Sequence, residues 1–453
     1  MNLYKKFSPY AQWLVVLLAM LLPFLIIRSF PKFFHGSDVD DFWRWSQGWA
    51  AGWQSVYINC ERCNYPFLGT LLSGGVMSWI DIENFLHLAS RFRYYLALVD
   101  ALNILVIWFI LMKMRVRNTP LWAGLIGLLP SSWLGSSVWG QIDGIGQLLI
   151  LAFFILLIWF NSKERSEKQY YLFLMLAGVL LSFMLLTKQL IYFSLFALGL
   201  VLLASIVLYS RTIGKAGLSV LVAAISIVLP VLVLDLNLNL KEPYFSHLQY
   251  VLATGSKHGD TISSVGFNVW VFFVKDLLGS SHAAIPIQVG SMTLFSIVPY
   301  SLGIILFLLV NAVLFYCFAK HIWQQRSQKL RAFTTDTILL FFLYLALVNL
   351  SFNLTLTGTH ERYLYHFYPF VLIACLGLKD RSPYFNRVML AVLLIGALIY
   401  GAFLYAYLTL LVRTYSVFVL RALGAFHLFL FGYLIYSMRM HFKSHAFDES
   451  VTS

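Results

Sequence analysis

Three carboxylates stand together in the first long polar segment of the chain, residues 35–65. Asp38, Asp40 and Asp41 fall within four consecutive positions, and apolar segments lie on both sides. A carboxylate held at a lipid–water boundary can have a raised pKa and can then take a proton from a hydroxyl group. The segment therefore offers a general base for chemistry on a hydroxyl acceptor.

The alternative is an ordinary helix start. A helix beginning near Ser37 would bury Phe42 and Trp45 on one face, because both follow Asp38 at helical spacing. Ser37 or Asp38 would then be its N-cap. One cap needs one acid, however, and this segment offers three.

A lysine interrupts an apolar stretch later in the chain. Lys188, followed by Gln189, lies between two apolar segments. An ammonium group in this position either extends to the interface or takes an anionic partner. A lipid phosphate is a suitable partner on the outer face.

An arginine stands in the densest polar run after the acidic segment, residues 357–363. The guanidinium of Arg362 can hold a phosphate through two parallel hydrogen bonds. Glu361 lies between His360 and Arg362 and can hold either neighbour. The alternative is a plain ion pair that closes a helical hairpin.

Two further polar groups lie in or next to the outer loops. Two apolar segments are joined by the run Trp139-Gly140-Gln141-Ile142-Asp143. An interfacial Trp and an Asp that caps a helix are common at the ends of membrane spans. These structural roles do not exclude a role in a functional site. Cys60 and Cys63 form a C-x-x-C pair, which is too few ligands for a structural zinc site without partners elsewhere. We expect a local disulfide in an oxidising compartment, with two reduced thiols as the alternative.

The composition places most of the chain in lipid. Of 453 residues, 60% are hydrophobic and 11% charged, and the mean hydropathy is +0.79. A soluble globule cannot bury this much apolar surface. The net charge of +13 comes from short basic clusters between apolar runs, which sets membrane topology and does not indicate nucleic-acid binding.

The apolar periodicity predicts an all-α polytopic membrane protein of roughly twelve transmembrane helices. The two outer loops, residues 30–93 and 235–292, are expected to carry short interfacial helices. Both termini are expected in the cytoplasm, since most basic residues then fall in short inside loops. The expected spans are residues 11–27, 94–112, 121–138, 142–160, 170–186, 190–209, 218–234, 294–318, 337–352, 365–378, 388–411 and 417–436.

We expect one membrane-embedded domain over residues 1–453 with two halves. The half 1–215 contains the acidic outer loop, and the half 216–453 contains the later outer loop and the polar hairpin 357–365. No P-loop and no G-x-G-x-x-G leading into a helix is present in the sequence, so cytosolic nucleotide chemistry has no obvious site.

The order of these motifs resembles the membrane glycosyltransferases of the GT-C superfamily, in particular bacterial mannosyl- and glucosyltransferase-like members and the dolichyl-phosphate-glucose-dependent enzymes. The resemblance runs from Asp38 to Tyr363. It consists of D-x-x-x-F-x-x-W, N-Y-P, W-G-Q-x-D, T-K-Q, G-F-N-x-W and H-E-R-Y, in that order. The chain departs from many members at Tyr65-Pro66-Phe67, where they have Tyr-Pro-Pro, and the Cys60/Cys63 pair is not general to the superfamily.

The resemblance implies an inverting transfer of a hexose, mannose or glucose, from a polyprenyl-phosphate donor to a hydroxyl of a glycan, lipid or protein. The essential loop acid falls on Asp38, with Asp41 as the fallback. Donor-phosphate contacts are expected from His360, Glu361, Arg362, Lys188 and Gln189. Sugar or acceptor contacts are expected from Trp45, Tyr65, Trp139, Gln141, Asp143 and Asn268.

We expect no cofactor and no required divalent metal, although Asp38 with Asp40 or Asp41 has the oxygen ligands to hold one. The expected setting is a monomer in the bacterial inner membrane with its site on the periplasmic face. The rival hypothesis is a transporter or flippase for a lipid-linked saccharide, which predicts inverted repeats and polar residues near mid-membrane.

Overall fold

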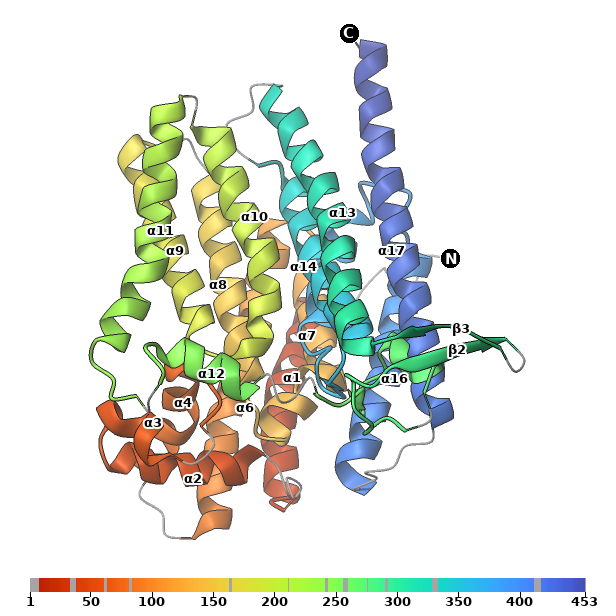
Figure 1. Cartoon of the computed structure of the whole chain (residues 1–453). Helices are drawn as coiled ribbons and strands as arrows, with labels where there is room; N and C mark the ends of the chain where they lie inside the picture. The colour runs from red at the N-terminus through yellow and green to blue at the C-terminus, as the bar shows by residue number, and fades with distance from the viewer. Residues whose placement is uncertain are drawn as a thin grey trace. The chain divides into compact units, whose positions relative to one another are not determined.

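The computed structural model describes residues 8–32, 38–60, 63–80, 84–162, 165–210, 212–240, 243–255, 260–274, 276–289, 292–327, 333–410 and 417–452. Helices dominate, as the hydropathy pattern predicts (Figure 1). The all-α prediction is confirmed apart from four short strands. The chain divides into two compact units, each built from several segments, unlike the two sequence halves expected above. Unit 1 comprises residues 1–195, 210–254 and 396–411, and unit 2 comprises residues 196–209, 255–395 and 412–453.

Unit 1 contains the long helices that flank the acidic segment and the short helices within it. α1 packs against α6 and α7, and α6 packs against α8. The long elements are α1 (Pro9–Ser29), α6 (Phe85–Lys113), α8 (Asp143–Asn161), α9 (Glu167–Leu185) and α11 (Ile213–Asp235), and the shorter α7 (Thr119–Leu128) packs among them. The short ones are α2 (Asp38–Ala50), α3 (Val56–Asn59), α4 (Phe67–Thr70), a π-helical turn (Leu71–Gly75), α5 (Val76–Trp79) and α12 (His247–Gly255).

Unit 2 is built around α14 (Thr335–Thr355), which is buried along its length. α14 packs against α13 (Pro299–Ser327), α15 (Phe367–Leu378) and α17 (Val417–Thr452). β2 (Ile285–Val289) and β3 (Met292–Ile297) form an antiparallel hairpin. α10 (Tyr192–Tyr209) and α16 (Arg387–Leu410) each contribute residues to both units.

Ten helices in the described part of the chain are long and apolar enough to cross a membrane. Two expected spans, residues 121–138 and 365–378, are shorter helices instead. α7 ends before Pro130, because the residue preceding a proline avoids the helical region and proline cannot donate a backbone hydrogen bond. The ten residues of α7 and the twelve of α15 extend about 15 and 18 Å at 1.5 Å per residue. Neither reaches across a hydrocarbon core of about 30 Å.

The outer segments differ from the expectation in one respect. The acidic loop carries short helices as predicted, from α2 to α5. The later polar region carries α12 and also the β2–β3 hairpin, so it is not purely helical. In unit 2 the two-residue strand β1 (Ser263–Ser264) pairs in parallel with β4 (Thr359–His360). This pairing places the loop around Ser263 beside the polar hairpin, although the sequence of that loop does not by itself indicate a function.

Candidate functional site

Helix α2 presents its acids at one end and buries its opposite face. Asp38, Asp40 and Asp41 occupy its first turn, where the helix dipole favours carboxylates, and all three are partly exposed. Phe42 and Trp45 are buried, with ring centroids 5.1 Å apart. The predicted burial of these two residues on one face is therefore confirmed. Ser37, the other expected N-cap, lies outside the described residues.

A close backbone contact fixes α2 against the turn that carries Gln141 and Asp143. Gly140 adopts a φ of +92°, and a Cβ there would lie 2.3 Å from Cγ2 of Val39. Only glycine fits this position, because any side chain would collide with α2 and would strain the backbone. The structure thus brings the D-x-x-x-F-x-x-W and W-G-Q-x-D motifs together.

Lys188 is buried and has an anionic partner inside the protein. Its Nζ lies 2.8 Å from Oδ1 of Asp143 and donates to Oε1 of Gln141, also at 2.8 Å. The side chains of Lys188 and Asp143 are 7% and 1% exposed. Tyr65 donates its hydroxyl proton to the same oxygen of Gln141 at 3.0 Å. Asp143 meets the lysine charge, where the sequence suggested a lipid phosphate.

The amide of Gln141 has one end occupied and one end available. Its Oε1 accepts from Lys188 and Tyr65, which fixes the orientation of the amide. Its Nε2 is buried and has no acceptor among the described residues. A buried donor without an acceptor is costly, so this N–H₂ group is suited to a ligand oxygen.

The loop between α3 and α4 is fastened beneath α2. Cys60 and Cys63 form a disulfide with a Cα–Cα distance of 5.7 Å. Both are buried, and Cys60 packs directly on Gly48 of α2. Gln189 donates its side-chain amide to the carbonyl of Asn64 in the same loop. Gln189 therefore supports the loop that carries Tyr65.

The expected sugar-stacking residues are mostly core residues. Trp45 is 3% exposed and packs edge-on against Tyr65 at 5.1 Å, and Trp139 is 8% exposed. Trp43 on α2 is 39% exposed and is therefore the tryptophan of this helix with surface available for stacking. The positions of Trp45 and Trp139 make them supports of the site, because their rings are covered by neighbouring side chains.

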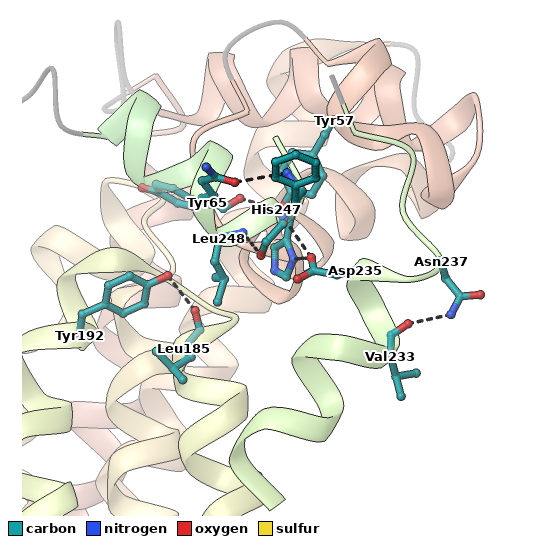
Figure 2. A network of polar contacts seen from close by, with 12 residues as sticks. Tyr57, Tyr65, Leu185, Tyr192, Val233, Asp235, Asn237, His247 and Leu248 are labelled. Carbon is teal, nitrogen blue, oxygen red and sulfur yellow. Dashed lines mark hydrogen bonds and ion pairs between the residues drawn. The ribbon is translucent and has the colours of Figure 1, made fainter. Parts of the chain in front are cut away.

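Sequence reasoning missed a buried polar cluster at the end of α11. Asp235 accepts the backbone N–H of His247 at 2.9 Å and also contacts the His247 ring (Figure 2). Tyr57 stands over this ring with centroids 5.9 Å apart and donates its hydroxyl to the carbonyl of Tyr65 at 2.9 Å. Burial raises the pKa of the Tyr57 phenol well above its usual value. The sequence signal that could have indicated this cluster is Asp235 at the end of an apolar span, with His247 in the polar region that follows.

In unit 2 the polar hairpin forms a compact triad. Arg362 donates to Oε1 of Glu361 at 2.9 Å, and Nδ1 of His360 lies 3.8 Å from its Oε2. The Glu361 side chain is 1% exposed, whereas Arg362 and His360 are 15% and 20% exposed. Burial alone would raise the pKa of the Glu361 carboxyl, but the Arg362 guanidinium and the His360 ring outweigh it and lower the pKa below its usual value. The predicted ion pair is present, with the guanidinium partly open.

Asn268 serves the same hairpin from the adjacent loop. Its buried amide donates to the carbonyls of Ile262 and Leu356 and to Oγ1 of Thr359, at 2.9 to 3.0 Å. Its side-chain oxygen accepts the backbone N–H of Trp270 at 3.2 Å. The Asn268 amide therefore joins its own loop to the polar hairpin, and its hydrogen bonds are explained by this structural role.

Among the described residues no group of three or more His, Cys, Asp or Glu side chains is arranged to hold a metal ion. No family model matches the chain, and no curated protein matches it. Among solved structures, the chain is similar to the crystal structure of ArnT from Cupriavidus metallidurans bound to undecaprenyl phosphate. The two share 12% sequence identity with a TM-score of 0.47, over 94% of this chain and 77% of that chain.

Proposed function

We propose that the chain is a membrane glycosyltransferase of the GT-C type. It transfers a hexose, mannose or glucose, from a polyprenyl-phosphate donor to a hydroxyl group on the outer face of a bacterial inner membrane. The observation that carries the proposal is the packing of α2 on the turn 139–143 through Gly140 and Val39. This packing places partly exposed carboxylates on the same structural unit as the unsatisfied Gln141 amide.

The reaction is a single displacement at the anomeric carbon. The acceptor oxygen forms the new bond, the bond from that carbon to the phosphate oxygen breaks, and the configuration inverts. The acceptor proton passes to the Asp38 carboxylate, and the polyprenyl phosphate leaves with the bonding electron pair. A phosphate leaves without a proton donor when a cation meets its charge, so a second catalytic carboxylate is not needed.

The other residues take binding and positioning roles. Arg362, partly exposed and paired at one end with Glu361, is the proposed ligand of the donor phosphate. Gln141 offers its Nε2 to a sugar or phosphate oxygen. Lys188 holds the Gln141 carbonyl end and Asp143, and so fixes the direction of that amide.

The test is Asp38→Asn, which keeps size and hydrogen bonding but removes the proton acceptor. Transfer from a polyprenyl-phosphate hexose in liposomes should fall by about 10²–10⁴-fold while donor affinity is retained, because general-base catalysis contributes about that much. Asp41→Asn, on the same turn, is the matched control and should be milder. Loss in Asp41→Asn with normal turnover in Asp38→Asn would move the base to Asp41. Normal turnover in both would contradict the proposal.

The buried Lys188–Asp143 pair favours a second candidate, a transporter or flippase, because ionisable pairs inside a helix bundle often mark a transport pathway. Movement of a labelled lipid-linked saccharide across the liposome membrane separates the two functions. Translocation without transfer, lost in Lys188→Met, would support transport over transfer.

A further inference from the structure

Unit 1 contains a small cavity that none of the three acids of α2 lines. It is enclosed by α1, α6, α7, α8 and the turn that follows Pro130, and its volume is about 10 Å³. That is about the space that one water molecule or one small ion requires. Its polar lining consists of Asp100, Asn103, Ser132 and Gln147.

Asn103 directs an unsatisfied oxygen to this region. It lies one turn after Asp100 on α6 and is 3% exposed. Its Nδ2 donates to the carbonyl of Gly144 at 2.8 Å, which fixes the orientation of the amide. Its Oδ1 is buried and has no donor among the described residues.

Gln147 supplies a second unsatisfied oxygen from another helix. It lies on α8, lines the same cavity and is 2% exposed. Its Oε1 is buried and, within the described part of the chain, receives no hydrogen bond. Two buried amide oxygens without donors on one cavity wall indicate a ligand, because such groups are rarely left unsatisfied.

Asp100 adds a carboxylate near the middle of the membrane-spanning helix α6. Its oxygens accept from Oγ of Ser136 at 2.9 Å and from the backbone N–H of Ser137 at 3.3 Å. It is 3% exposed. An acidic side chain inside a membrane span is costly and is therefore a functional candidate by default.

A proline makes one more oxygen available on the wall. Pro23 and Ala19 both line the cavity from α1. Pro23 has no N–H, so it cannot donate to the carbonyl of Ala19, its normal partner four residues earlier. The Ala19 carbonyl therefore lacks its usual donor from within the helix.

We propose that this cavity is a binding site for one monovalent cation of the size of Na⁺. The Asp100 carboxylate, Asn103 Oδ1 and Gln147 Oε1 are its ligands, and Ala19 and Ser132 line the same cavity. Hard cations take oxygen ligands of these types. One carboxylate matches a single positive charge, and the cavity has room for about one small ion.

The alternative occupant of this cavity is a single water molecule. A water molecule has two protons to donate, which match the two unsatisfied oxygens of Asn103 and Gln147. It brings no positive charge to the Asp100 carboxylate on the same wall. A cation attracts both amide oxygens and the carboxylate at once.

The site would act on the first turn of α8. Asn103 holds the carbonyl of Gly144, the neighbour of Asp143, and Gln147 lies one turn further along the same helix. A cation joining Asn103 on α6 to Gln147 on α8 would therefore stabilise the turn that carries the Lys188–Asp143 pair.

The experiment is thermal unfolding of the full chain in detergent, at constant ionic strength, in NaCl, KCl or N-methylglucamine chloride. A ligand that binds the folded state raises the midpoint in a saturable way, and Na⁺ should raise it by a few degrees relative to N-methylglucamine. Potassium should act more weakly. Equal midpoints in all three salts would mean a structural water only and would overturn the proposal.

Two variants and a control assign the effect to this cavity. Asp100→Asn and Gln147→Leu should remove the Na⁺ dependence, while Asp336→Asn, at a surface ion pair in unit 2, should keep it. Retention of the dependence in Asp100→Asn and Gln147→Leu would overturn the site. Should either variant fail to fold, binding of ²²Na⁺ to the wild-type protein decides: saturable binding supports the site and none overturns it. No arm of the experiment uses transferase activity, so its failure and that of the proposed function are distinguishable.

Discussion

In the described part of the chain, each unit has a lysine or arginine paired with a carboxylate that is 1% exposed, and these two pairs are built differently. In unit 1 the Lys188–Asp143 pair joins residues 45 positions apart, and both side chains are almost fully buried. In unit 2 the Arg362–Glu361 pair joins neighbours in the sequence, and the guanidinium keeps 15% of its surface exposed. The first pair closes a tertiary contact, whereas in the second the guanidinium remains partly exposed.

The difference separates a structural cation from a binding cation. A buried lysine paired with a carboxylate that is 1% exposed is strongly committed to that partner, because either group alone would remain buried and unsolvated. A guanidinium has five N–H groups, and that of Arg362 keeps 15% of its surface exposed, so a phosphate can approach it. We therefore propose a positioning role for Lys188 and a donor-binding role for Arg362.

The largest expected effect is that of Lys188→Met. It leaves the Asp143 carboxylate buried and without its ammonium, and breaking a buried pair from one side costs about 3–5 kcal/mol of unfolding free energy. Thermal unfolding in detergent should show a large fall in the midpoint, with transfer activity lost at the same time.

The double variant Lys188→Met/Asp143→Asn sharpens this result, because it removes both charges. It should recover most of the lost stability and little of the activity. Lys215→Met is the matched control, since the Lys215–Glu167 pair is about half exposed and contributes at most about 1 kcal/mol. A Lys188→Met protein as stable as the control would contradict the distinction between the two pairs.

A smaller loss of stability is expected from Arg362→Ala. It removes one charge-assisted hydrogen bond of Glu361, worth about 1.5–3 kcal/mol, while His360 remains near the carboxylate. Because the guanidinium would meet the phosphate in both the bound donor and the transition state, donor affinity and turnover should weaken together. Titration with a polyprenyl-phosphate hexose measures the donor affinity, and initial rates of transfer measure the turnover. Normal donor affinity would return Arg362 to a purely structural role.

The sequence predicted what depends on local spacing. Apolar runs gave the long helices, and the positions of Phe42 and Trp45 gave the buried face of α2. The Glu361–Arg362 ion pair could be predicted because the two residues are adjacent in the sequence. Pro130 indicates that α7 ends before it, but the continuous apolar run around Pro130 led to the prediction of one longer span.

Long-range contacts were not predictable from spacing. Lys188 required an anion, but its choice of Asp143 depends on how the helices pack. The same holds for Asp235 with His247 and for Asn268, whose amide bridges residues 88 and 91 positions away. The cavity at Asp100 draws its walls from several helices, so the one or two polar residues in each apolar run gave only a weak signal of a shared site.

The smallest expected effect is a pH dependence carried by Glu361. Its pKa is lowered from an ordinary value of 4.5, so the folded state favours the ionised carboxylate relative to the unfolded chain. The resulting stabilisation is complete above about pH 4.5 and is lost as the pH falls through the lower pKa of the folded protein. The wild-type protein should therefore be more stable than Glu361→Gln at pH 6, and this advantage should shrink as the pH falls below about 4.5.

Thermal unfolding midpoints of the two proteins between about pH 3 and pH 7 measure that advantage directly. Glu167→Gln serves as the control, because its side chain is 54% exposed in a surface pair and its removal should change the midpoint little at any pH. A constant difference between wild type and Glu361→Gln over the whole range would mean that the carboxylate is not held ionised by Arg362 and His360. The Arg362–Glu361 pair would then be as weak as the surface pair, and the guanidinium would be even more available to a phosphate than its 15% exposure indicates.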